Sequence, residues 1–414
     1  MIARSSPKRT EAEPVEPSRL IELRGGLGAV PGVSLAGVHA GIKKRKPDLA
    51  LISFAEDQHA ASVITTNEIK AAPIVVTEGH LETSGSRMRA VVCNSGCANA
   101  CTGERGERDT RQTARQAAAL LGIEATQVAV ASTGVIGVYL PMDRVVKGLE
   151  RAVKDLEEGM EASYDAAEAI MTTDNEPKLS AYAFYVGKRR YVVGGIAKGS
   201  GMIAPNMATM LAFVATNAPM AREALLTELR EATDASFNMI SVDGDMSTND
   251  AVYAFCPAGK GGAPPGFAEA LRAVTHELAY AMVRDGEGAT KTLTVEVSGA
   301  RDSAQARAVA RAVVNSSLVK TALHGEDPNW GRIIAAAGSV HAGIDPEAWS
   351  LYLNDKLWVE RGAIEVLSEA EGHSELEHTA VRVRLDLGIG EVSATAWGCD
   401  FSRDYVRINA HYRT

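Results

Sequence analysis

Thr209, in the middle of the chain, stands where an unusual nucleophile could form. It follows Ala208 in a loop of small residues, KGSGMIAPNMATM (198–210), and an apolar run comes after it. A threonine hydroxyl is a weak nucleophile unless a base removes its proton, and the α-amine of an N-terminal threonine can be that base. This chemistry requires cleavage after Ala208, by attack of the hydroxyl on the preceding carbonyl. The alternative is an ordinary threonine that satisfies a nearby backbone group.

Polar loops rich in glycine recur along the chain without being low in complexity. Loops presented by a rigid scaffold commonly carry functional residues, so we predict that these loops build one composite site from distant segments. They are 94–103, 132–137, 171–177, 198–210, 241–250, 284–288 and 324–332.

The elements between these loops alternate between two periodicities. Apolar residues at helical spacing predict helices at 105–121, 142–158, 221–235, 266–283 and 302–314. Strand-like runs occur at 87–93, 126–131, 191–197, 292–298, 379–386 and 391–398, and 180–196 predicts a hairpin with its turn from Gly187 to Arg190. The mixture favours an α/β or mixed α+β fold.

The composition excludes several classes of protein. The chain is 46% hydrophobic and 23% charged, as is usual for globular proteins, and its formal charge of −9 argues against binding to nucleic acid. No apolar run approaches the roughly 20 residues that span a bilayer. Residues 1–20 are polar and rich in proline and glutamate, which predicts a flexible tail and no secretory signal. We therefore expect a cytoplasmic protein without membrane contact.

Three cysteines, Cys93, Cys97 and Cys101, share a spacing of four that could suit a metal site. No histidine lies near them in the sequence, and small residues surround them. We interpret them as small buried side chains and expect no metal.

Several motifs resemble those of the ornithine acetyltransferase (glutamate N-acetyltransferase) family. KGSGMIAPNMATML resembles the family's cleavage-site motif, and NSGCANACTG, STGVIG, SVDGDMSTND and KTALHGEDPNWGR resemble other family blocks in family order. The resemblance extends over nearly the whole chain after residue 20. It implies the family's fold, which is related to that of self-cleaving aminopeptidases with an N-terminal nucleophile. It also implies self-cleavage into residues 21–208, preceded by the tail, and residues 209–414, which remain associated as a heterotetramer.

The resemblance further implies an acetyltransferase of arginine biosynthesis. Cleaved Thr209 would take the acetyl group of N-acetylornithine, ornithine would leave, and glutamate would attack to give N-acetylglutamate. No cofactor is expected because Thr209 itself carries the acyl group. The sequence leaves open whether acetyl-CoA is a second donor.

The family's site residues can be placed on this chain one by one. Thr133 and Gly134 in STGVIG match its oxyanion hole, where a hydroxyl and a backbone N–H can both donate. Lys198 matches a substrate-binding lysine, and we expect it to pair with a substrate carboxylate. Glu287 matches a binding glutamate that could hold an ammonium group.

Three more binding positions follow from the resemblance. Asn409 and the terminal Thr414 match positions at the end of the family chain. Asn175 stands where the family usually has threonine, after Thr172-Thr173-Asp174. Asparagine can still donate and accept, but it is longer than threonine, so this departure bears on specificity more than on reaction class.

Other activities fit the sequence less well. Ser317 and Lys320 form an S-x-x-K pattern without its companion motifs, and Asp243 and Asp245 suggest a calcium loop that lacks its glycine and final glutamate. The remaining alternatives are a self-cleaving amidase or aminopeptidase relative and an uncleaved small-molecule binding protein.

Overall fold

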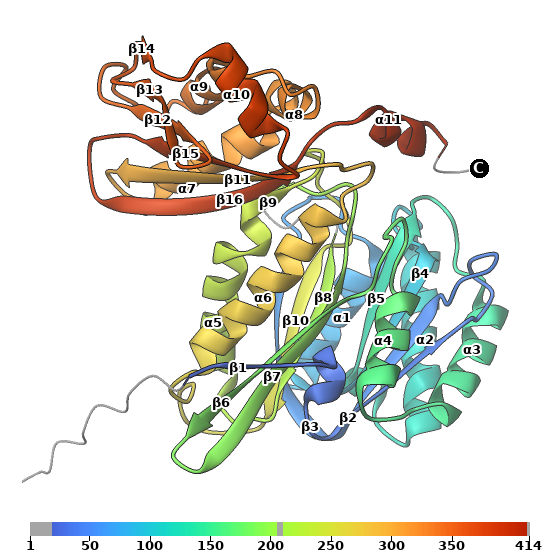
Figure 1. The fold of residues 1–414 in the computed structure, drawn as a ribbon. Coiled ribbons are helices and arrows are strands. Elements are labelled where there is room, and N and C mark those ends of the chain that lie inside the picture. The colour runs from blue at the N-terminus through green and yellow to red at the C-terminus, as the bar shows by residue number, and fades with distance from the viewer. Residues whose placement is uncertain (1–18, 205–209, 412–414) are drawn as a thin grey trace, which may run out of the picture.

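The computed structural model describes residues 19–204 and 210–411. Two β-sheets, one of nine strands and one of seven, form a larger and a smaller lobe of mixed α/β structure. The smaller lobe sits on one end of the larger lobe (Figure 1). The mixed α/β fold class is as predicted, and all but the last two residues of the predicted tail lie outside the described part of the chain.

The larger sheet runs in the order β1-β6-β7-β8-β10-β3-β4-β5, with β2 paired to β3. Its strands are β1 (Ile21–Leu23), β2 (Val33–Val38), β3 (Leu49–Ile64), β4 (Arg87–Cys97), β5 (Val128–Val135), β6 (Lys178–Val186), β7 (Arg189–Lys198), β8 (Leu211–Thr216) and β10 (Ala251–Pro257). The helices of this lobe are α1 (Ala72–Thr83), α2 (Gly103–Leu121), α3 (Met142–Lys154), α4 (Met160–Ala169), α5 (Arg222–Ala235) and α6 (Phe267–Arg284).

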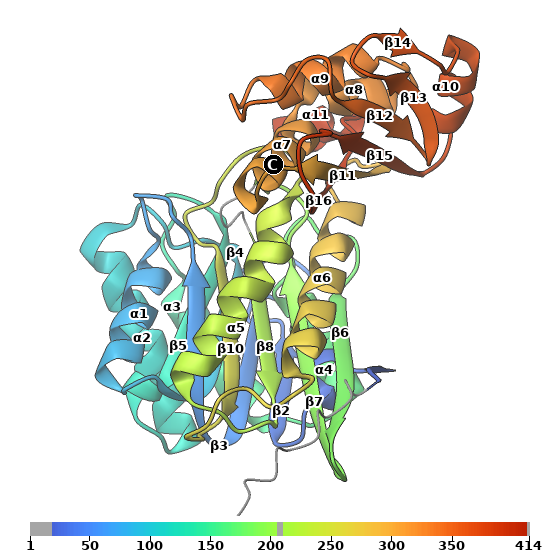
Figure 2. The ribbon, with the colours of Figure 1, turned by 90° about the vertical axis from the view of Figure 1, so that its left-hand side faces the viewer.

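Helices cover the larger sheet on both faces. α5 and α6 pack side by side over one face (Figure 2), while α4 packs against β2 and β3 in a different core cluster. The central strand β8 serves both cores: Ala212 and Val214 belong to the cluster under α5 and α6, and Leu211 and Phe213 to the other. Burial on both faces explains why this strand is a continuous apolar run.

The same sheet interleaves the two predicted cleavage products. β7, from before residue 208, pairs antiparallel with β8, from after it, and β10 pairs antiparallel with β3. A break between the two segments would therefore leave both halves of the chain hydrogen-bonded in one sheet.

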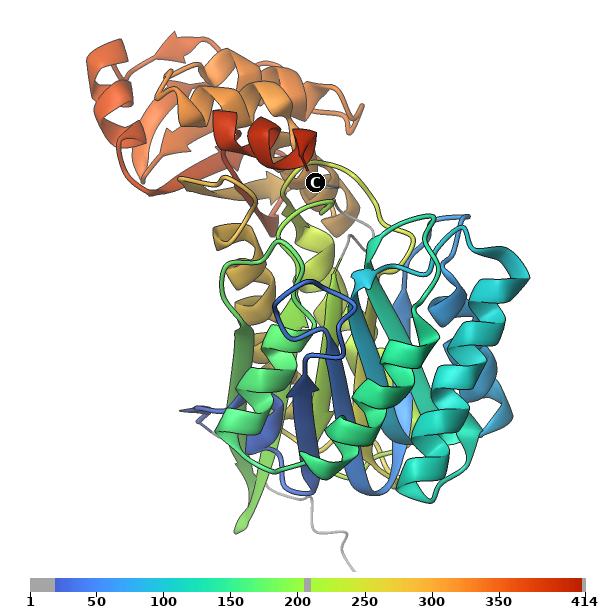
Figure 3. The same cartoon turned by 90° about the vertical axis from the view of Figure 1, so that its right-hand side faces the viewer.

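The smaller sheet runs in the order β14-β13-β12-β15-β11-β16-β9. Its strands are β9 (Ile240–Ser241), β11 (Thr292–Ala300), β12 (Ser350–Leu353), β13 (Lys356–Glu360), β14 (Ile364–Glu365), β15 (Ala380–Asp386) and β16 (Val392–Cys399). Its helices are α7 (Ser303–Asn315), α8 (Ser317–His324), α9 (Trp330–Gly338) and α10 (Glu369–Leu376), and a last helix, α11 (Arg403–Ala410), follows β16. α11 projects to one side of this lobe in Figure 1, and in Figure 3 it lies along the lower part of the lobe, above the larger one.

The predicted helices and strands are confirmed, and their ends agree with the structure to within a few residues. α3 ends at Lys154, four residues short of the predicted end at 158. The hairpin turn is tighter than predicted, because β6 ends at Val186 and β7 begins at Arg189. Among the helices of the described residues, none has both the length and the apolar character needed to cross a membrane.

Candidate active site

A cavity of about 230 Å³ opens where the ends of β5 and β7 meet the loops that join the two lobes. Six of the seven polar loops contribute to its wall. The lining residues are Ala98, Thr133, Gly134, Val135, Ile136, Thr172, Thr173, Lys198, Gly201, Met202, Ser247, Asn249, Glu287 and Asn409. The seventh loop, 324–332, instead borders a separate hollow with residues 365–369 in the smaller lobe.

Five of the predicted site residues line this one cavity: Thr133, Gly134, Lys198, Glu287 and Asn409. They come from β5, from β7, from the loop after α6 and from α11. The structure thus brings together residues that are far apart in the sequence, as the composite-site prediction requires.

The Thr133–Gly134 pair lies at the end of β5, which runs parallel to β4. Gly134 has φ of +129°, and a Cβ atom there would lie 2.4 Å from the carbonyl carbon of Gly96. Only glycine combines this backbone conformation with this close approach. The Thr133 side chain is buried, and its Oγ1 accepts a hydrogen bond from Lys198 Nζ at 3.0 Å, which leaves the hydroxyl proton free to be donated elsewhere.

Lys198 ends β7 with its side chain almost fully buried. Burial lowers the pKa of its ammonium group, and the negative charges of Asp174 and Asp250 oppose that shift. Within the described part of the chain, Lys198 Nζ bonds to Thr133 and to no carboxylate, and a buried cation of this kind gains most from an anionic ligand. This environment fits the expectation that Lys198 receives a carboxylate.

Glu287 and Asn409 form an acidic part of the cavity wall. Asn409 Nδ2 donates to Glu287 Oε2 at 2.7 Å, and the Glu287 backbone N–H donates to Ser200 O at 2.7 Å. A Cβ atom on Gly201 would lie 2.4 Å from the Glu287 carboxyl carbon, so glycine is needed for this approach. Ser402 holds α11 in place by capping its first turn and donating to Gly288 O at 2.6 Å.

A buried ion triad fixes the loops behind the cavity. Lys178 Nζ lies 2.8 Å from Asp174 Oδ1 and 2.7 Å from Asp285 Oδ2, with all three side chains nearly inaccessible. Asp174 also accepts from the backbone N–H groups of Gly199 at 2.7 Å and Thr172 at 3.0 Å. The triad thereby ties the 171–177 loop to the residue that follows Lys198.

Asn175 does not reach the cavity wall. Its side chain is exposed, and its Nδ2 donates to Asp285 Oδ1 at 2.8 Å while its backbone N–H donates to Asp285 Oδ2 at 3.0 Å. Its neighbours Thr172 and Thr173 line the cavity instead. The short polar side chain at 175 therefore supports the triad, and the prediction that it contacts substrate finds no geometric support.

Asp243, one of the two aspartates that suggested a calcium loop, holds the backbone of the 198–210 loop in place. Its carboxylate accepts from the backbone N–H groups of Met202 at 2.6 Å and Ile203 at 2.8 Å, and from Tyr405 Oη at 3.2 Å. It therefore joins the loop before the predicted cleavage site to α11.

Three predicted residues, Ala208, Thr209 and Thr414, lie outside the described residues. The chain resumes at Met210, whose N–H donates to Asp250 Oδ1 at 2.9 Å and whose carbonyl accepts from Ala251 N at 3.1 Å. Met210 thus leads directly into β8.

Sequence reasoning missed several lining residues. Asn249 is buried and donates from Nδ2 to Ala98 O at 2.7 Å and to Ser132 O at 2.8 Å, so it binds the 247–250 segment to the strand that carries Thr133. The signal that could have found it was its place in the polar segment 241–250, whose individual members the sequence does not rank.

The prediction that the three cysteines are small buried side chains is confirmed for two of them. Cys93 and Cys97 are buried, and burial raises the pKa of the Cys93 thiol to about 12. Cys101 is exposed.

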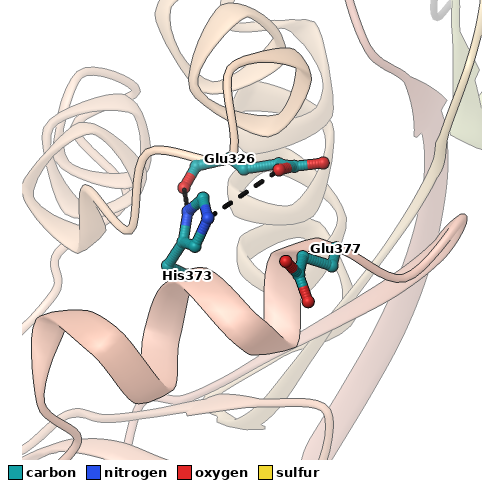
Figure 4. A group of neighbouring side chains, drawn as sticks. All are labelled: Glu326, His373 and Glu377. Atoms are coloured by element: carbon teal, nitrogen blue, oxygen red, sulfur yellow. Dashed lines mark hydrogen bonds and ion pairs between the residues drawn. The ribbon is translucent and has the colours of Figure 1, made fainter.

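Among residues 19–204 and 210–411, one group of possible metal ligands, Glu326, His373 and Glu377, lies in the smaller lobe (Figure 4). Lys291 Nζ lies 2.7 Å from Glu326 Oε1, and His373 Nδ1 lies 2.8 Å from Glu326 O. An ammonium group thus already pairs with the central carboxylate, and we interpret the group as an ion-pair network.

Comparisons with known proteins show which proteins this chain is similar to. The model of the ArgJ family matches residues 34–414. An arginine biosynthesis bifunctional protein ArgJ from Symbiobacterium thermophilum is 50% identical over 403 residues, covering 95% of this chain and 99% of that protein. The protein of the same name from Bacillus licheniformis is 43% identical, covering 94% of this chain and 97% of that protein. A crystal structure of ornithine acetyltransferase complexed with ornithine, from Mycobacterium tuberculosis, is 43% identical, covers 45% of this chain and 98% of that chain, and superposes with a TM-score of 0.42.

Proposed function

The chain belongs to the ArgJ family, and from this premise we propose that it transfers the acetyl group of N-acetylornithine to glutamate through an acetyl ester on Thr209. The observation that carries the proposal is the convergence of Thr133, Gly134, Lys198 and Glu287 on one cavity. The wall of this cavity offers hydrogen-bond donors, a cation and an anion. The cation and the anion could bind the carboxylate and the ammonium group of an amino-acid substrate. The hydrogen-bond donors could stabilise the negative charge that forms during acyl transfer.

The chemistry begins with maturation of the chain. Thr209 Oγ attacks the carbonyl carbon of Ala208, the Ala208–Thr209 amide bond breaks, and its nitrogen takes up the hydroxyl proton. Water then hydrolyses the resulting ester. The products are residues 1–208, with a new carboxylate, and residues 209–414, with a free α-amine on Thr209.

Acetyl transfer repeats the attack on a substrate amide. The α-amine accepts the Thr209 hydroxyl proton as Oγ attacks the acetyl carbon. The C–N bond to ornithine breaks, and the proton passes to the leaving amine. The neutral amine of glutamate then attacks the acetyl ester, and Thr209 Oγ leaves with a proton.

The described residues supply the remaining roles. Thr133 Oγ1 and the backbone N–H of Gly134 would stabilise the negative charge of each tetrahedral intermediate, a contribution worth about 10²–10³ in rate for one such donor. Lys198 would receive the substrate carboxylate, and Glu287, held by Asn409, would receive the side-chain ammonium of N-acetylornithine.

The pairing of β7 with β8 and of β10 with β3 supports lasting association of the two products. We propose that two copies of each product form the heterotetramer that the family resemblance implies. Acetyl-CoA is proposed as a second acetyl donor to the same threonine.

Mass spectrometry of the denatured protein tests the proposal. We expect two fragments, one beginning at Thr209, and in Thr209→Ala a single inactive chain of 43.7 kDa. A Thr209→Ala protein that is still cleaved, or still transfers acetyl groups, would refute the mechanism.

Mass spectrometry of the cleaved chain does not distinguish the proposed acetyltransferase from a self-cleaving amidase. Cleaved enzyme with labelled N-acetylornithine should pass the label to glutamate. Release of the label only as acetate would favour the amidase. Repeating the assay with labelled acetyl-CoA tests the second donor.

A further inference from the structure

Four consecutive cations occur in the loop that joins β2 to β3: Lys43, Lys44, Arg45 and Lys46. We call residues 41–46 the basic loop. Its last three cations are exposed, and in the part of the chain that the structure describes none of these three is ion-paired with a carboxylate. Because the whole chain carries a formal charge of −9, this cluster is a local exception that attracts anions. The mechanism above gives it no role.

The backbone of the basic loop is held in place by hydrogen bonds. The buried Asp48 carboxylate accepts from the N–H groups of Ala40 at 2.6 Å and Lys43 at 2.7 Å. His39 Nδ1 lies 2.9 Å from Lys46 O at the end of the loop. The exposed side chains therefore project from a fixed support, and a ligand that binds them does not have to order the backbone first.

The basic loop packs against two segments of the cavity wall. Lys43 Nζ donates to Met171 O at 3.0 Å, and Met171 directly precedes Thr172, which lines the cavity. A Cβ atom on Gly96 would lie 2.9 Å from Lys43 Cγ, and Gly96 pairs with Gly134 of the wall. Figure 3 shows the loop, in dark blue, at the end of the larger lobe nearer the smaller one. The three exposed cations therefore follow directly on a residue that touches the cavity wall.

The cavity itself is too small for a whole molecule of acetyl-CoA. Its volume is about 230 Å³, whereas pockets that enclose drug-sized molecules have about 300–1,000 Å³. In acetyl-CoA the acetyl thioester stands at one end of a long flexible arm, and a nucleotide with several phosphate groups stands at the other. When the acetyl group occupies the cavity, the nucleotide must lie on the surface outside it.

We propose that Lys44, Arg45 and Lys46 bind the phosphate groups of acetyl-CoA while its acetyl group lies in the cavity. The proposal rests on the proposed function, in which acetyl-CoA is a second donor. Arginine recognises phosphate through paired hydrogen bonds, and lysine recognises it as a point charge. N-acetylornithine and glutamate carry no phosphate, so the basic loop serves one donor and not the other.

Replacement of the three exposed cations together (Lys44→Gln, Arg45→Gln and Lys46→Gln) tests the site. Lys43 is retained because its Nζ holds the loop against Met171. Each exposed ion pair is worth a few-fold in affinity, so KM for acetyl-CoA should rise about tenfold. KM should stay at the wild-type value for N-acetylornithine and for S-acetylpantetheine, which has the thioester and the arm but no phosphate. An unchanged KM for acetyl-CoA, or an equal rise for all three donors, would overturn the proposal.

The turn of the β6–β7 hairpin offers a matched control. Lys188, Arg189 and Arg190 are also exposed, but β7 runs for 10 residues from Arg189 to Lys198 at the cavity. A strand of this length spans about 30 Å, so these cations lie at the far end of the sheet. Their replacement by glutamine removes the same charge and should leave KM for acetyl-CoA unchanged. A rise equal to that of the basic-loop variant would show that KM follows the net charge of the protein, and it would overturn the proposed site.

Calorimetric titration of the wild-type protein with coenzyme A does not depend on any variant folding. Coenzyme A should bind with an affinity that falls as the salt concentration rises, because exposed charges are screened. ATP shares the phosphate chemistry and should inhibit transfer from acetyl-CoA more than transfer from N-acetylornithine. Binding of ATP to the basic loop without that inhibition would mean that the loop recognises a free nucleotide and not the donor, which would overturn the proposal.

The titration also separates this proposal from the proposed function. A protein that transfers acetyl groups from N-acetylornithine to glutamate but does not bind coenzyme A would overturn the basic-loop proposal alone. A protein that binds coenzyme A, with affinity lost in the basic-loop variant, but transfers acetyl groups from neither donor would overturn the proposed function alone.

Discussion

Gly134→Ala is the substitution whose effect follows most directly from the structure. The new Cβ would lie 2.4 Å from the carbonyl carbon of Gly96 and 2.7 Å from the nitrogen of Cys97, and ordinary contact begins at 3.4 Å. One of the two backbones must therefore move by about 1 Å, and a displacement of this size in a catalytic group costs about 10²-fold in rate. The φ of +129° adds strain for any residue with a Cβ atom.

We expect Gly134→Ala to lower both self-cleavage and acetyl transfer by about 10²–10³, the usual cost of losing one oxyanion donor. Cleavage is followed by the intact fraction on denaturing gels over time, and transfer by kcat with N-acetylornithine and glutamate. Gly137→Ala is the matched control. Gly137 also has a positive φ, of +80°, but an added Cβ would meet nothing within 4 Å. Equal losses in both variants, or full activity in Gly134→Ala, would show that the Thr133–Gly134 pair is not the oxyanion hole.

Three further predictions concern the charges of the site. Lys198→Met should raise KM for both substrates about tenfold or more, because a hydrogen bond to a charged group is worth about 1.5–3 kcal/mol; unchanged KM values would remove Lys198 from substrate binding. Glu287→Gln keeps an acceptor for Asn409 but loses its charge, so KM should rise more for N-acetylornithine than for glutamate; equal rises would contradict the ammonium assignment. Burial alone would raise the pKa of Asp174, but Lys178 and Lys198 lower it to about 2 from 3.8. Its contribution to stability is therefore complete above pH 3.8 and is lost as the pH falls towards 2. Asp174→Asn should destabilise the fold by about 3–5 kcal/mol at neutral pH and flatten the dependence of the melting temperature on pH in that window; a wild-type melting curve would contradict this.

Much of the fold could be predicted because its signals are local. The apolar spacing in 266–283 and the short strand-like run in 191–197 express the preferences of a single helix or strand, and both elements occur where predicted. The ends of the helices were predicted less accurately. α3 ends before its predicted end at residue 158, because an amphipathic pattern can continue past the last helical hydrogen bond.

The candidate site was predicted in part. Thr133, Gly134, Lys198, Glu287 and Asn409 line one cavity as expected, whereas Asn175 turns to Asp285. A polar residue next to two cavity-lining threonines looks the same in a sequence whether it faces a substrate or a buried ion triad.

The sequence by itself determined which chemistry is available: a threonine after alanine in a loop of small residues, glycines beside possible donors, and single charged residues for a charged substrate. These are properties of residue type and of covalent neighbours. Only the tertiary structure decided which of them meet. The pairing of β8 with β7 and β10, and the return of α11 to the cavity, bring together residues far apart in the chain. The physical reason is that local spacing along the chain carries no information about contacts made across a sheet.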